Sequence, residues 1–375
     1  MNELLDLNRE WIEEYWQKTV EKLRRNSVTL RDKIPLVTED GVYDDHSKSS
    51  AWTNGFWPGI MWLMYSATGE DCFKETAQTA EKMMDTALAN YKKLHHDVGF
   101  MWHISSGASL KLTGDEKSKE RALHAAATLA SRYNVNGEFI RAWNDEDAPG
   151  WTIIDSMMNI PLLYWAAEEC KNVSFKQIAM HHADTVLKDH IRPDGSVYHI
   201  VMYDVESGEC LGAAPSTQGY EPQNSSWSRG QSWALYGFTL SYIHTGEQRY
   251  LDAAKRVAHY FIANVCNTNY IPLADFRAPA EPVYIDSSAG ALAACGLIEL
   301  AKVVPEYEKK MYMQAAINIM KALCDTQCDF SDKEQSILQN SSACYARGVH
   351  RPWIYGEYFY VEAMYKLMGF EPQLW

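Results

Sequence analysis

A repeated pair of helices is the feature that most constrains the fold of this 375-residue chain. Segments that are apolar on most faces alternate with charged amphipathic segments, and short turns join the two kinds. The turn recurs as Thr68-Gly69-Glu70, Thr113-Gly114-Asp115 and Thr245-Gly246-Glu247. Glycine in such a turn is typical of a helix C-cap, and the acidic residue suits the positive end of the next helix dipole. The pattern predicts stacked helical hairpins.

The repeat predicts a closed ring of six hairpins. Apolar helices are expected at 50–71, 97–116, 151–173, 225–248, 286–306 and 351–369, and amphipathic helices at 3–25, 72–91, 117–133, 174–191, 249–265 and 307–326. The first helix has no partner before it and the last has none after it, so the two complete each other if the ring closes. An open solenoid would instead show polar capping repeats. We therefore expect an all-α fold, one (α/α)6 barrel domain over residues 1–375, with twelve helices in two concentric rings and no sheet larger than a minor ribbon.

Charge and hydropathy exclude some classes of partner. The chain has 35 Lys and Arg residues against 49 Asp and Glu residues, a net charge of −14 at pH 7. Nucleic acid is not expected as a partner, because phosphate binding needs a basic face. The longest apolar stretch is too short to span a bilayer, and the acidic N-terminus lacks the pattern of an export signal. We therefore expect no membrane partner and a cytoplasmic location.

The eight cysteines predict free thiols in a reducing compartment. Cys295 lies inside an apolar helical pattern, where a buried thiol is expected. Only Cys324 and Cys328 are close in sequence, and no second pair completes a zinc site. The chain also lacks the HExxH spacing of metalloproteases. We expect no catalytic metal and no cofactor.

The starts of the inner helices are expected to carry the chemistry. These starts meet at one mouth of the ring, and the segments before them are rich in aromatic, acidic and histidine residues. The segments are 52–57, 95–100, 151–155, 225–233, 284–288 and 351–358. Aromatic rings stack on the C–H faces of sugars, and polar side chains fix the hydroxyl groups. The mouth therefore predicts a carbohydrate site.

Asp155 is the acidic residue that is hardest to explain by structure alone. It lies in WTIIDSMMNIPLLYWA, and a buried carboxylate is unfavourable unless it has a partner or a function. Asp97, from the neighbouring hairpin, is expected close to it. Two close carboxylates do not both ionise easily, so one keeps its proton near neutral pH and can act as a general acid.

Several of these residues also have a purely structural explanation. An aspartate at a helix start often caps the helix, which fits Asp97, Asp286 and Asp45. A tryptophan on an inner helix is more often part of the core than of a binding surface. His181 and His182 lie inside an outer helix, where a structural role is expected.

Six ordered segments resemble the motifs of the unsaturated glucuronyl hydrolases, glycoside hydrolase family 88. They are WTNGFWPGIMWL, HHDVGF, IIDSMMNIPLLYWA, WSRGQSWALYGF, DSSAGALAACGLIEL and YGEYFYVEA. The resemblance runs from about residue 50 to residue 368, and the family fold is an (α/α)6 barrel. It implies a hydrolase that releases 4,5-unsaturated glucuronic acid from the non-reducing end of glycosaminoglycan oligosaccharides made by polysaccharide lyases.

The chemistry implied by the resemblance is hydration of a vinyl ether. Protonation at C4 gives an oxocarbenium-like cation at C5, water adds at C5, and rearrangement of the hemiketal releases the glycosidic bond. One carboxyl group can serve both steps, first as acid and then as base. The motif match makes Asp155 that group. Asp97 becomes the second catalytic carboxylate, which helps to hold the substrate and keeps Asp155 protonated.

The resemblance also implies a set of substrate-binding residues. These are Trp52, His96, Trp143, His199, Thr217, Gln218, Trp227, Arg229, Trp233 and Tyr358. Arg229 is expected to hold an anionic group, because a guanidinium fits a carboxylate or sulfate with two hydrogen bonds. The segment 345–352, YARGVHRP, corresponds to a region that helps some family members to bind a sulfated second sugar, and here it contains no lysine.

Three other functions compete with this one. An unsaturated rhamnogalacturonyl hydrolase shares the barrel and the chemistry but acts on pectin fragments, and the HHDVGF and WSRGQSW motifs favour the glucuronyl family. A sugar 2-epimerase needs bases, usually histidines, on both faces of the ring, and no such pairing stands out. A non-catalytic oligosaccharide-binding barrel does not need an acid in the apolar setting of Asp155.

Overall fold

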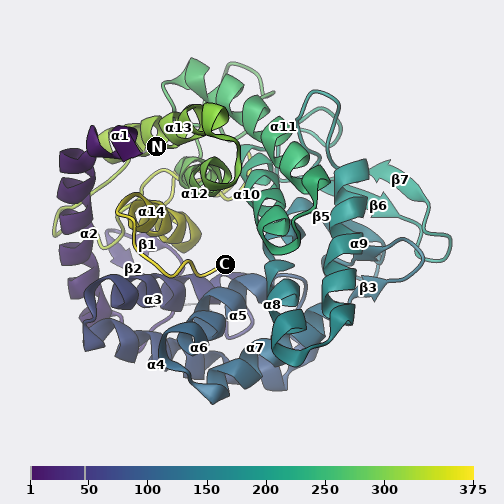
Figure 1. Ribbon diagram of the computed structural model, residues 1–375, viewed down its shortest axis with the longest axis horizontal. Helices are drawn as coiled ribbons and strands as arrows, with labels where there is room; N and C mark the ends of the chain where they lie inside the picture. The colour runs from purple at the N-terminus through teal and green to yellow at the C-terminus, as the bar shows by residue number, and fades with distance from the viewer. Residues whose placement is uncertain (1, 46–47) are drawn as a thin grey trace.

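The helices of the computed structural model, which describes residues 2–45 and 48–375, form two concentric rings (Figure 1). The outer ring consists of α2 (Arg9–Thr29), α4 (Asp71–Ala89), α7 (Glu116–Ala130), α9 (Val173–Asp189), α11 (Gln248–Val265) and α13 (Glu306–Thr326). The inner ring consists of α3 (Phe56–Thr68), the interrupted helix α5 (Val98–Trp102) and α6 (Ala108–Thr113), α8 (Pro161–Cys170), α10 (Ser228–Thr245), α12 (Ser287–Val303) and α14 (Ile354–Leu367). The predicted double ring of helical hairpins is confirmed.

The ring closes through its first and last inner helices. Helix α14 packs against α12 on one side and against α3 on the other. It also contacts α2, so the first outer helix and the last inner helix complete each other as predicted. The inner helices are largely buried, and residues 287–301 of α12 are all buried. One connected apolar core runs from Ile12 to Trp375, and the treatment of residues 1–375 as one domain stays a prediction.

The repeated turn has the conformation that its sequence predicts. Gly69, Gly114 and Gly246 each follow an inner helix with φ angles of 71°, 73° and 72°. This left-handed conformation is favourable for glycine, which lacks a Cβ atom, and it ends each helix. After the second turn, the side chain of Asp115 accepts a hydrogen bond from Ser118 N and caps α7.

Some elements differ from the periodicity analysis. The predicted first helix divides into α1 (Asn2–Asp6) and α2. The second inner helix contains a π-helical turn, His103–Gly107, and the third begins as a 3-10 helix, Ile154–Met158, before α8. Helical periodicity alone does not reveal such changes in winding.

The loops contain more sheet than predicted. Short hairpins form from β1 (Thr38–Glu39) with β2 (Val42–Tyr43), and from β3 (Tyr133–Asn134) with β4 (Phe139–Ile140). The three-stranded antiparallel sheet of β5 (Trp151–Ile153), β6 (Ile200–Tyr203) and β7 (Cys210–Ala213) is larger than the expected ribbon. The expectation was wrong because pairing between strands about 50 residues apart leaves no local period in the sequence.

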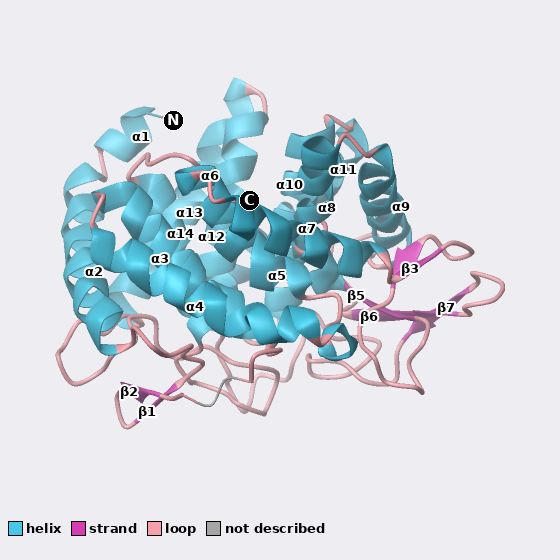
Figure 2. Ribbon diagram, turned by 90° about the horizontal axis from the view of Figure 1, so that it is seen from below, coloured by secondary structure: helices cyan, strands magenta, loops and turns pink. Residues whose placement is uncertain are grey.

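The long loops lie at one end of the barrel. Figure 2 shows them, together with all the labelled strands, along one edge of the molecule, while tight turns connect helices at the opposite end. The inner helices begin at the loop end, so the predicted convergence on one mouth is confirmed. Within the described part of the chain, no helix is long and apolar enough to cross a membrane.

All eight cysteines are free. Cys295, Cys324 and Cys344 are buried, whereas Cys170, Cys210 and Cys266 are exposed. The expected burial of thiols therefore holds for only part of the set. The expectation was drawn from the apolar neighbours of residues such as Cys295, and it does not extend to cysteines near helix ends and in loops.

Candidate active site

A cavity of about 590 Å³ opens at the loop end of the barrel. Its volume falls within the range of about 300–1,000 Å³ that is usual for small-molecule sites. Loops before several inner helices contribute to its walls. The lining residues are Leu36, Ala51, Trp52, Thr53, His95, Asp97, Trp143, Ile153, Asp155, His199, Gln218, Trp227, Arg229, Ala343, Cys344, Arg347, Gly348, Trp353 and Tyr355.

Most of the predicted site residues meet in this cavity. Eight of the twelve line it: Asp97, Asp155, Trp52, Trp143, His199, Gln218, Trp227 and Arg229. The other four lie outside the cavity wall: His96, Thr217, Trp233 and Tyr358. The first set has the composition of a sugar site, and the second set needs another explanation.

Pairing between β5 and β6 brings Asp155 next to His199. The register pairs Ile153 with Ile200, and Ile154 N donates a hydrogen bond to His199 O over 3.0 Å. Asp155 follows in the first turn of the 3-10 helix, with its side chain 14% exposed. Its Oδ2 lies 3.5 Å from Nε2 of His199 and accepts no hydrogen bond from the described residues. This buried oxygen therefore faces His199, while the exposed part of the side chain lines the cavity.

The tautomer of His199 follows from its other contact. Nδ1 of His199 accepts a hydrogen bond from the backbone N–H of Gln218 over 3.1 Å. A ring nitrogen that accepts a hydrogen bond carries no proton, so the neutral ring carries its proton on Nε2, which faces Asp155. The Thr217 hydroxyl lies 3.5 Å from the same Nδ1. Thr217 therefore supports His199 instead of lining the cavity.

Asp97 is fixed by three neighbours. It precedes α5 without making a side-chain capping bond, so its position is not explained as an N-cap. Its Oδ1 accepts a hydrogen bond from Asn159 Nδ2 over 3.1 Å, and its Oδ2 lies 3.4 Å from His95 Nδ1 and 3.4 Å from His96 Nε2. Asn159 also donates to the backbone carbonyl of Asp155 over 3.1 Å. One asparagine thus links the two carboxylate segments.

Burial raises the pKa of Asp97 well above its ordinary value, and the neighbouring charge of Asp155 raises it further. The hydrogen bond from Asn159 opposes this rise only in part. This rise favours the protonated form of Asp97 and with it a proton shared by the pair. The assignment of the retained proton to Asp155 stays a prediction.

His95, rather than His96, reaches the cavity. His96 is fully buried behind it, with Nδ1 3.0 Å from the Ser156 hydroxyl. Burial lowers the pKa of His95 to about 4 and holds the pKa of His96 well below its usual range, so both rings are neutral at pH 7. The donor atoms of His95, His96 and Asp97 lie within 4.8 Å of one another, a spacing that can hold a metal ion. The metal motifs considered in the sequence, HExxH and paired cysteines, place their ligands several residues apart, so three consecutive ligands were not predicted.

Arg229 is already bound by protein groups. Its Nη1 lies 2.6 Å from Asp286 Oδ2 and also donates to Ser342 O, while Nη2 donates to Ala343 O. Asp286 also caps α12 by accepting a hydrogen bond from Ser288 N, as one of the predicted N-caps. Protein oxygens accept from Nη1 and from one N–H of Nη2, whereas Arg229 also lines the cavity, so its predicted contact with an anion stays a prediction.

A row of stacked rings forms one wall of the cavity. Trp52 stacks on Tyr355 with centroids 5.4 Å apart, and Tyr355 stacks on Trp353 at 6.1 Å with an interplanar angle of 7°. The guanidinium of Arg229 lies over the rings of Trp227 and Tyr355, at 4.5 and 4.8 Å from their centroids. The wall offers flat apolar surface next to the carboxyl pair.

Trp233 and Tyr358 lie deeper in the barrel than predicted. Trp233 is fully buried against Phe100 and Phe359, and Tyr358 is fully buried against Phe56 and Phe359. Trp233 follows Arg229 by four residues and Tyr358 follows Tyr355 by three. At 1.5 Å per residue, each ring begins about 5 Å further from the mouth. A motif match gives no measure of this depth along the helix axis.

The sequence analysis missed several residues of the cavity wall. His95 is the neighbour of the predicted His96, and Tyr355 lies three residues before the predicted Tyr358. Both lie inside the quoted motifs, so these motifs were the available signal. Trp353 lies in the predicted mouth segment 351–358. Leu36 and Ala343 carry no signal in the sequence that distinguishes them.

Asp45, His181 and His182, for which a structural role was considered, do not line the cavity. Asp45 does not stand at a helix start. His182 is buried in α9, where its Nδ1 accepts a hydrogen bond from Ile140 N, and His181 contacts the Tyr133 hydroxyl. Both histidines lie outside the cavity, as expected for structural residues.

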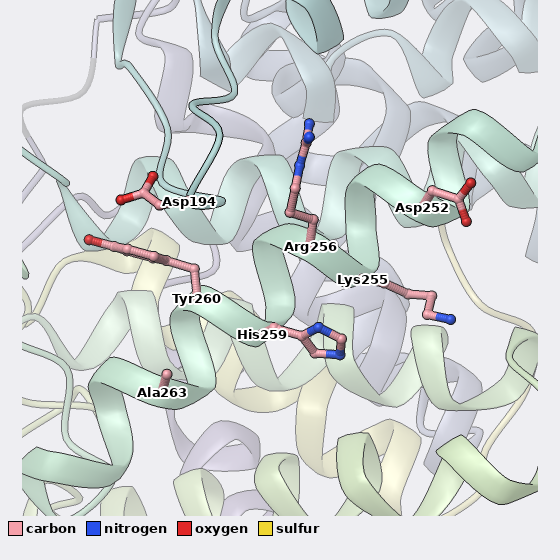
Figure 3. Close-up of a pocket in the computed structure, with 7 residues that line it drawn as sticks. All are labelled: Asp194, Asp252, Lys255, Arg256, His259, Tyr260 and Ala263. Atoms are coloured by element: carbon pink, nitrogen blue, oxygen red, sulfur yellow. The ribbon is translucent and has the colours of Figure 1, made fainter.

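A second hollow lies on the outer ring, over α11, and does not have the character of an active site. Figure 3 shows its side chains, which come from α11 apart from Asp194. Lys255 is paired with Glu308 at 2.7 Å, and Asp194 is paired with Arg277. The charged groups that line this hollow are largely paired with one another or with neighbours on the surface, so the cavity at the mouth remains the candidate site.

Comparison with known proteins identifies the family. Residues 26–362 match Glycosyl Hydrolase Family 88. The chain is 33% identical over 353 residues to the unsaturated glucuronyl hydrolase of Bacillus sp. (strain GL1). The matched stretch covers 92% of this chain and 93% of the Bacillus protein. The chain belongs to glycosyl hydrolase family 88. This membership confirms the family that the six motifs indicated and makes the chain a glycosidase.

Further family 88 proteins agree with this result. The chain is 32% identical over 369 residues to an unsaturated chondroitin disaccharide hydrolase of Streptococcus pneumoniae, covering 96% of this chain and 92% of the relative. The structure of this chain matches the crystal structure of the Bacillus enzyme with a TM-score of 0.87, over 94% of this chain and 96% of the Bacillus chain, at 33% identity. An aspartate-to-asparagine variant of the unsaturated glucuronyl hydrolase of Streptococcus agalactiae, complexed with dGlcA-GalNAc6S, matches with a TM-score of 0.84 at 27% identity, over 97% and 93% of the two chains.

Proposed function

We propose that this protein releases 4,5-unsaturated glucuronic acid from the non-reducing end of glycosaminoglycan oligosaccharides by hydrating the C4=C5 bond. The observation that carries the proposal is the carboxyl pair of Asp97 and Asp155, linked by Asn159 at the base of an aromatic cavity. The names of the family 88 relatives, and the unsaturated disaccharide bound to one of them, support the choice of substrate.

The carboxyl pair acts with one proton near neutral pH. Burial and the charge of Asp155 raise the pKa of Asp97 and so favour a shared proton, which Asp155 carries when it acts on the substrate. The Asp155 side chain lines the cavity and is 14% exposed, against 9% for Asp97, whose Oδ1 accepts a hydrogen bond from Asn159. Asp155 is therefore the group assigned to approach the substrate. The apparent pKa values of such a pair belong to both residues together.

Asp155 serves as acid and then as base. It gives a proton to C4, and the C4=C5 electron pair forms the new C–H bond and leaves an oxocarbenium-like cation at C5. Water then adds at C5 while the Asp155 carboxylate accepts its proton. The hemiketal opens, the glycosidic bond breaks and the remaining saccharide leaves. The Nε2–H of His199 faces Asp155 and can stabilise its carboxylate form after the first step.

The other predicted residues divide into contacts and supports. Trp52, Trp143 and Trp227 present rings to the cavity and stack on sugar faces, while Gln218 and His199 offer polar atoms there. The four residues outside the cavity wall act as supports: His96, Thr217, Trp233 and Tyr358. A cytoplasmic location is likewise proposed from the sequence, and cell fractionation tests it.

One assay separates this function from its competitors. The protein is incubated with unsaturated chondroitin or hyaluronan disaccharides while the ultraviolet absorbance of the conjugated double bond is followed. Loss of absorbance with these substrates, but not with unsaturated rhamnogalacturonan disaccharides, supports the proposal. Loss with rhamnogalacturonan alone favours the pectin enzyme. Binding without loss of absorbance favours a non-catalytic barrel, and Asp155→Asn serves as the inactive control.

A further inference from the structure

Arg132 lies outside the cavity wall, in the turn after α7, yet its guanidinium holds the loop that carries Trp143. Nε donates to Arg141 O over 2.9 Å, Nη1 to Asn144 Oδ1 over 2.8 Å, and Nη2 to the carbonyls of Ala142 and Trp143 over 2.9 Å each. Among the described residues, no carboxylate lies within 4.0 Å of this guanidinium, so backbone and amide oxygens satisfy a half-buried cation. Such a fork fixes the loop in one geometry.

The same hydrogen bonds reach the catalytic carboxylate segment by two routes. The carbonyl of Ala142 accepts from Arg132 and also from the backbone N–H of His96 over 3.2 Å. Asn144 accepts from Arg132 and donates to Leu94 O over 2.9 Å. Arg132 therefore ties the Trp143 loop to residues 94–97, and displacement of the guanidinium moves the stacking ring relative to Asp97.

Arg132 also contributes charge to the site. Burial and the nearby charge of Arg141 lower its pKa to about 10, which leaves it positively charged at neutral pH. Its charge favours the ionised form of Asp97 and disfavours protonation of His95 and His96. The groups that face Asp97 are Asp155, Asn159, His95, His96 and Arg132. Among them Arg132 is the one group that is positively charged at pH 7.

We propose that Arg132 is a positioning residue whose guanidinium fixes Trp143 relative to Asp97. The proposal rests on the proposed function, because it assigns Asp97 to catalysis. The role needs the planar guanidinium fork and not only a positive charge.

Two variants test this role. Arg132→Lys keeps the charge and loses the fork, whereas Arg132→Gln keeps a donor and loses the charge. Both should lower kcat/KM about 10- to 100-fold, through KM with little change in kcat, because the Trp143 ring is displaced. Arg141→Gln is the matched control, because Arg141 lies in the same loop and its side chain donates to Asp145 O; both parameters should stay at wild-type values.

A substrate-free measurement keeps this test distinct from the proposed function. Hydrogen exchange at the backbone N–H of His96, which donates to Ala142 O, reports the link between the Trp143 loop and residues 94–97. Exchange there should be faster in both variants and unchanged in Arg141→Gln, whatever substrate the enzyme accepts. Wild-type exchange or wild-type KM values in both variants overturn the positioning role.

Discussion

The imidazole of His199 faces the carboxyl group of Asp155, with Nε2 3.5 Å from Oδ2. The backbone N–H of Gln218 occupies the other ring nitrogen, so the ring proton lies on the side of Asp155. A donor in this position gains strength when Asp155 becomes a carboxylate during the reaction, because hydrogen bonds to ionised acceptors are the stronger ones.

His199→Asn tests this relationship against a purely structural role. The asparagine side chain is long enough to accept from Gln218 N–H but too short to reach Asp155, whereas His199→Ala loses both contacts. We expect both variants to lose about 10²–10³-fold in kcat, the usual range for removal of one donor to a developing charge. Steady-state kinetics on an unsaturated chondroitin disaccharide measure this. If His199→Asn has near wild-type kcat while His199→Ala does not, the His199 ring contributes only by holding the loop of Gln218 in place, and its contact with Asp155 does not contribute.

The glycine of HHDVGF has a physical reason. A Cβ atom on Gly99 would lie 2.5 Å from the Cα atom and 2.7 Å from Oδ1 of Asn159. Asn159 accepts from Phe100 N and donates to Asp97, so the close approach at Gly99 places the asparagine against the carboxyl pair. The glycine is therefore needed for contact between two backbones.

Gly99→Ala should impair catalysis without touching the substrate. The added methyl group displaces Asn159, and we expect a loss of about 10- to 100-fold in kcat/KM with a destabilisation of about 1–3 kcal/mol. Gly107→Ala in the same inner helix is the control, because its Cβ would meet its neighbours at 3.6 Å, an ordinary contact. Steady-state kinetics of both variants measure the loss in kcat/KM, and urea unfolding measures the loss in stability. Equal activity of the two variants would contradict the placement of Asn159 by Gly99.

Arg229→Ala should reduce stability as well as substrate binding. The substitution leaves Asp286 buried without its 2.6 Å partner, and removal of one member of a buried ion pair typically costs about 3–5 kcal/mol. The double variant with Asp286→Ala should lose less free energy of unfolding than the sum of the two single variants. Urea denaturation of all four proteins measures the coupling. Additive losses would mean that the two side chains do not stabilise each other.

The ring architecture was predictable because it depends on local signals. The Thr-Gly-acidic turns carry their conformation in three residues, and the alternation of apolar and amphipathic helices decides which helices are buried. Asp155 could be identified in the same way, since its apolar neighbours make a carboxylate conspicuous. These features need no knowledge of distant contacts.

The features of the site that the sequence did not predict depend on contacts between distant residues or on the depth of a side chain along a helix. The pair of Arg229 and Asp286 joins residues 57 positions apart, so this ion pair could not be predicted from WSRGQSW. The pairing of β5 with β6, which brings His199 to Asp155, leaves no periodic signal. Tyr355 and Tyr358 share one motif, and only the position of the mouth decides which ring meets the cavity.

The carboxyl pair itself provides the sharpest test. Asp155→Asn cannot give a proton to C4 or accept one from water, and its kcat should fall by about 10⁴-fold, the upper end for general acid–base groups, because one residue serves both steps. Asp97→Asn should also slow the reaction. Near-normal turnover by Asp155→Asn would overturn the assignment of the acid.

Removal of Asp97 should move the pH profile of the pair. Burial and the charge of Asp155 raise the pKa of Asp97, and Asp97→Asn removes this group together with the negative charge that it carries once it is ionised. The pair then loses its proton at lower pH, and the high-pH limb of kcat/KM should move down, with the acidic limb unchanged. Profiles of wild type and Asp97→Asn on one disaccharide measure this shift. A limb that moves up in Asp97→Asn would show that Asp97 does not help the pair to retain its proton.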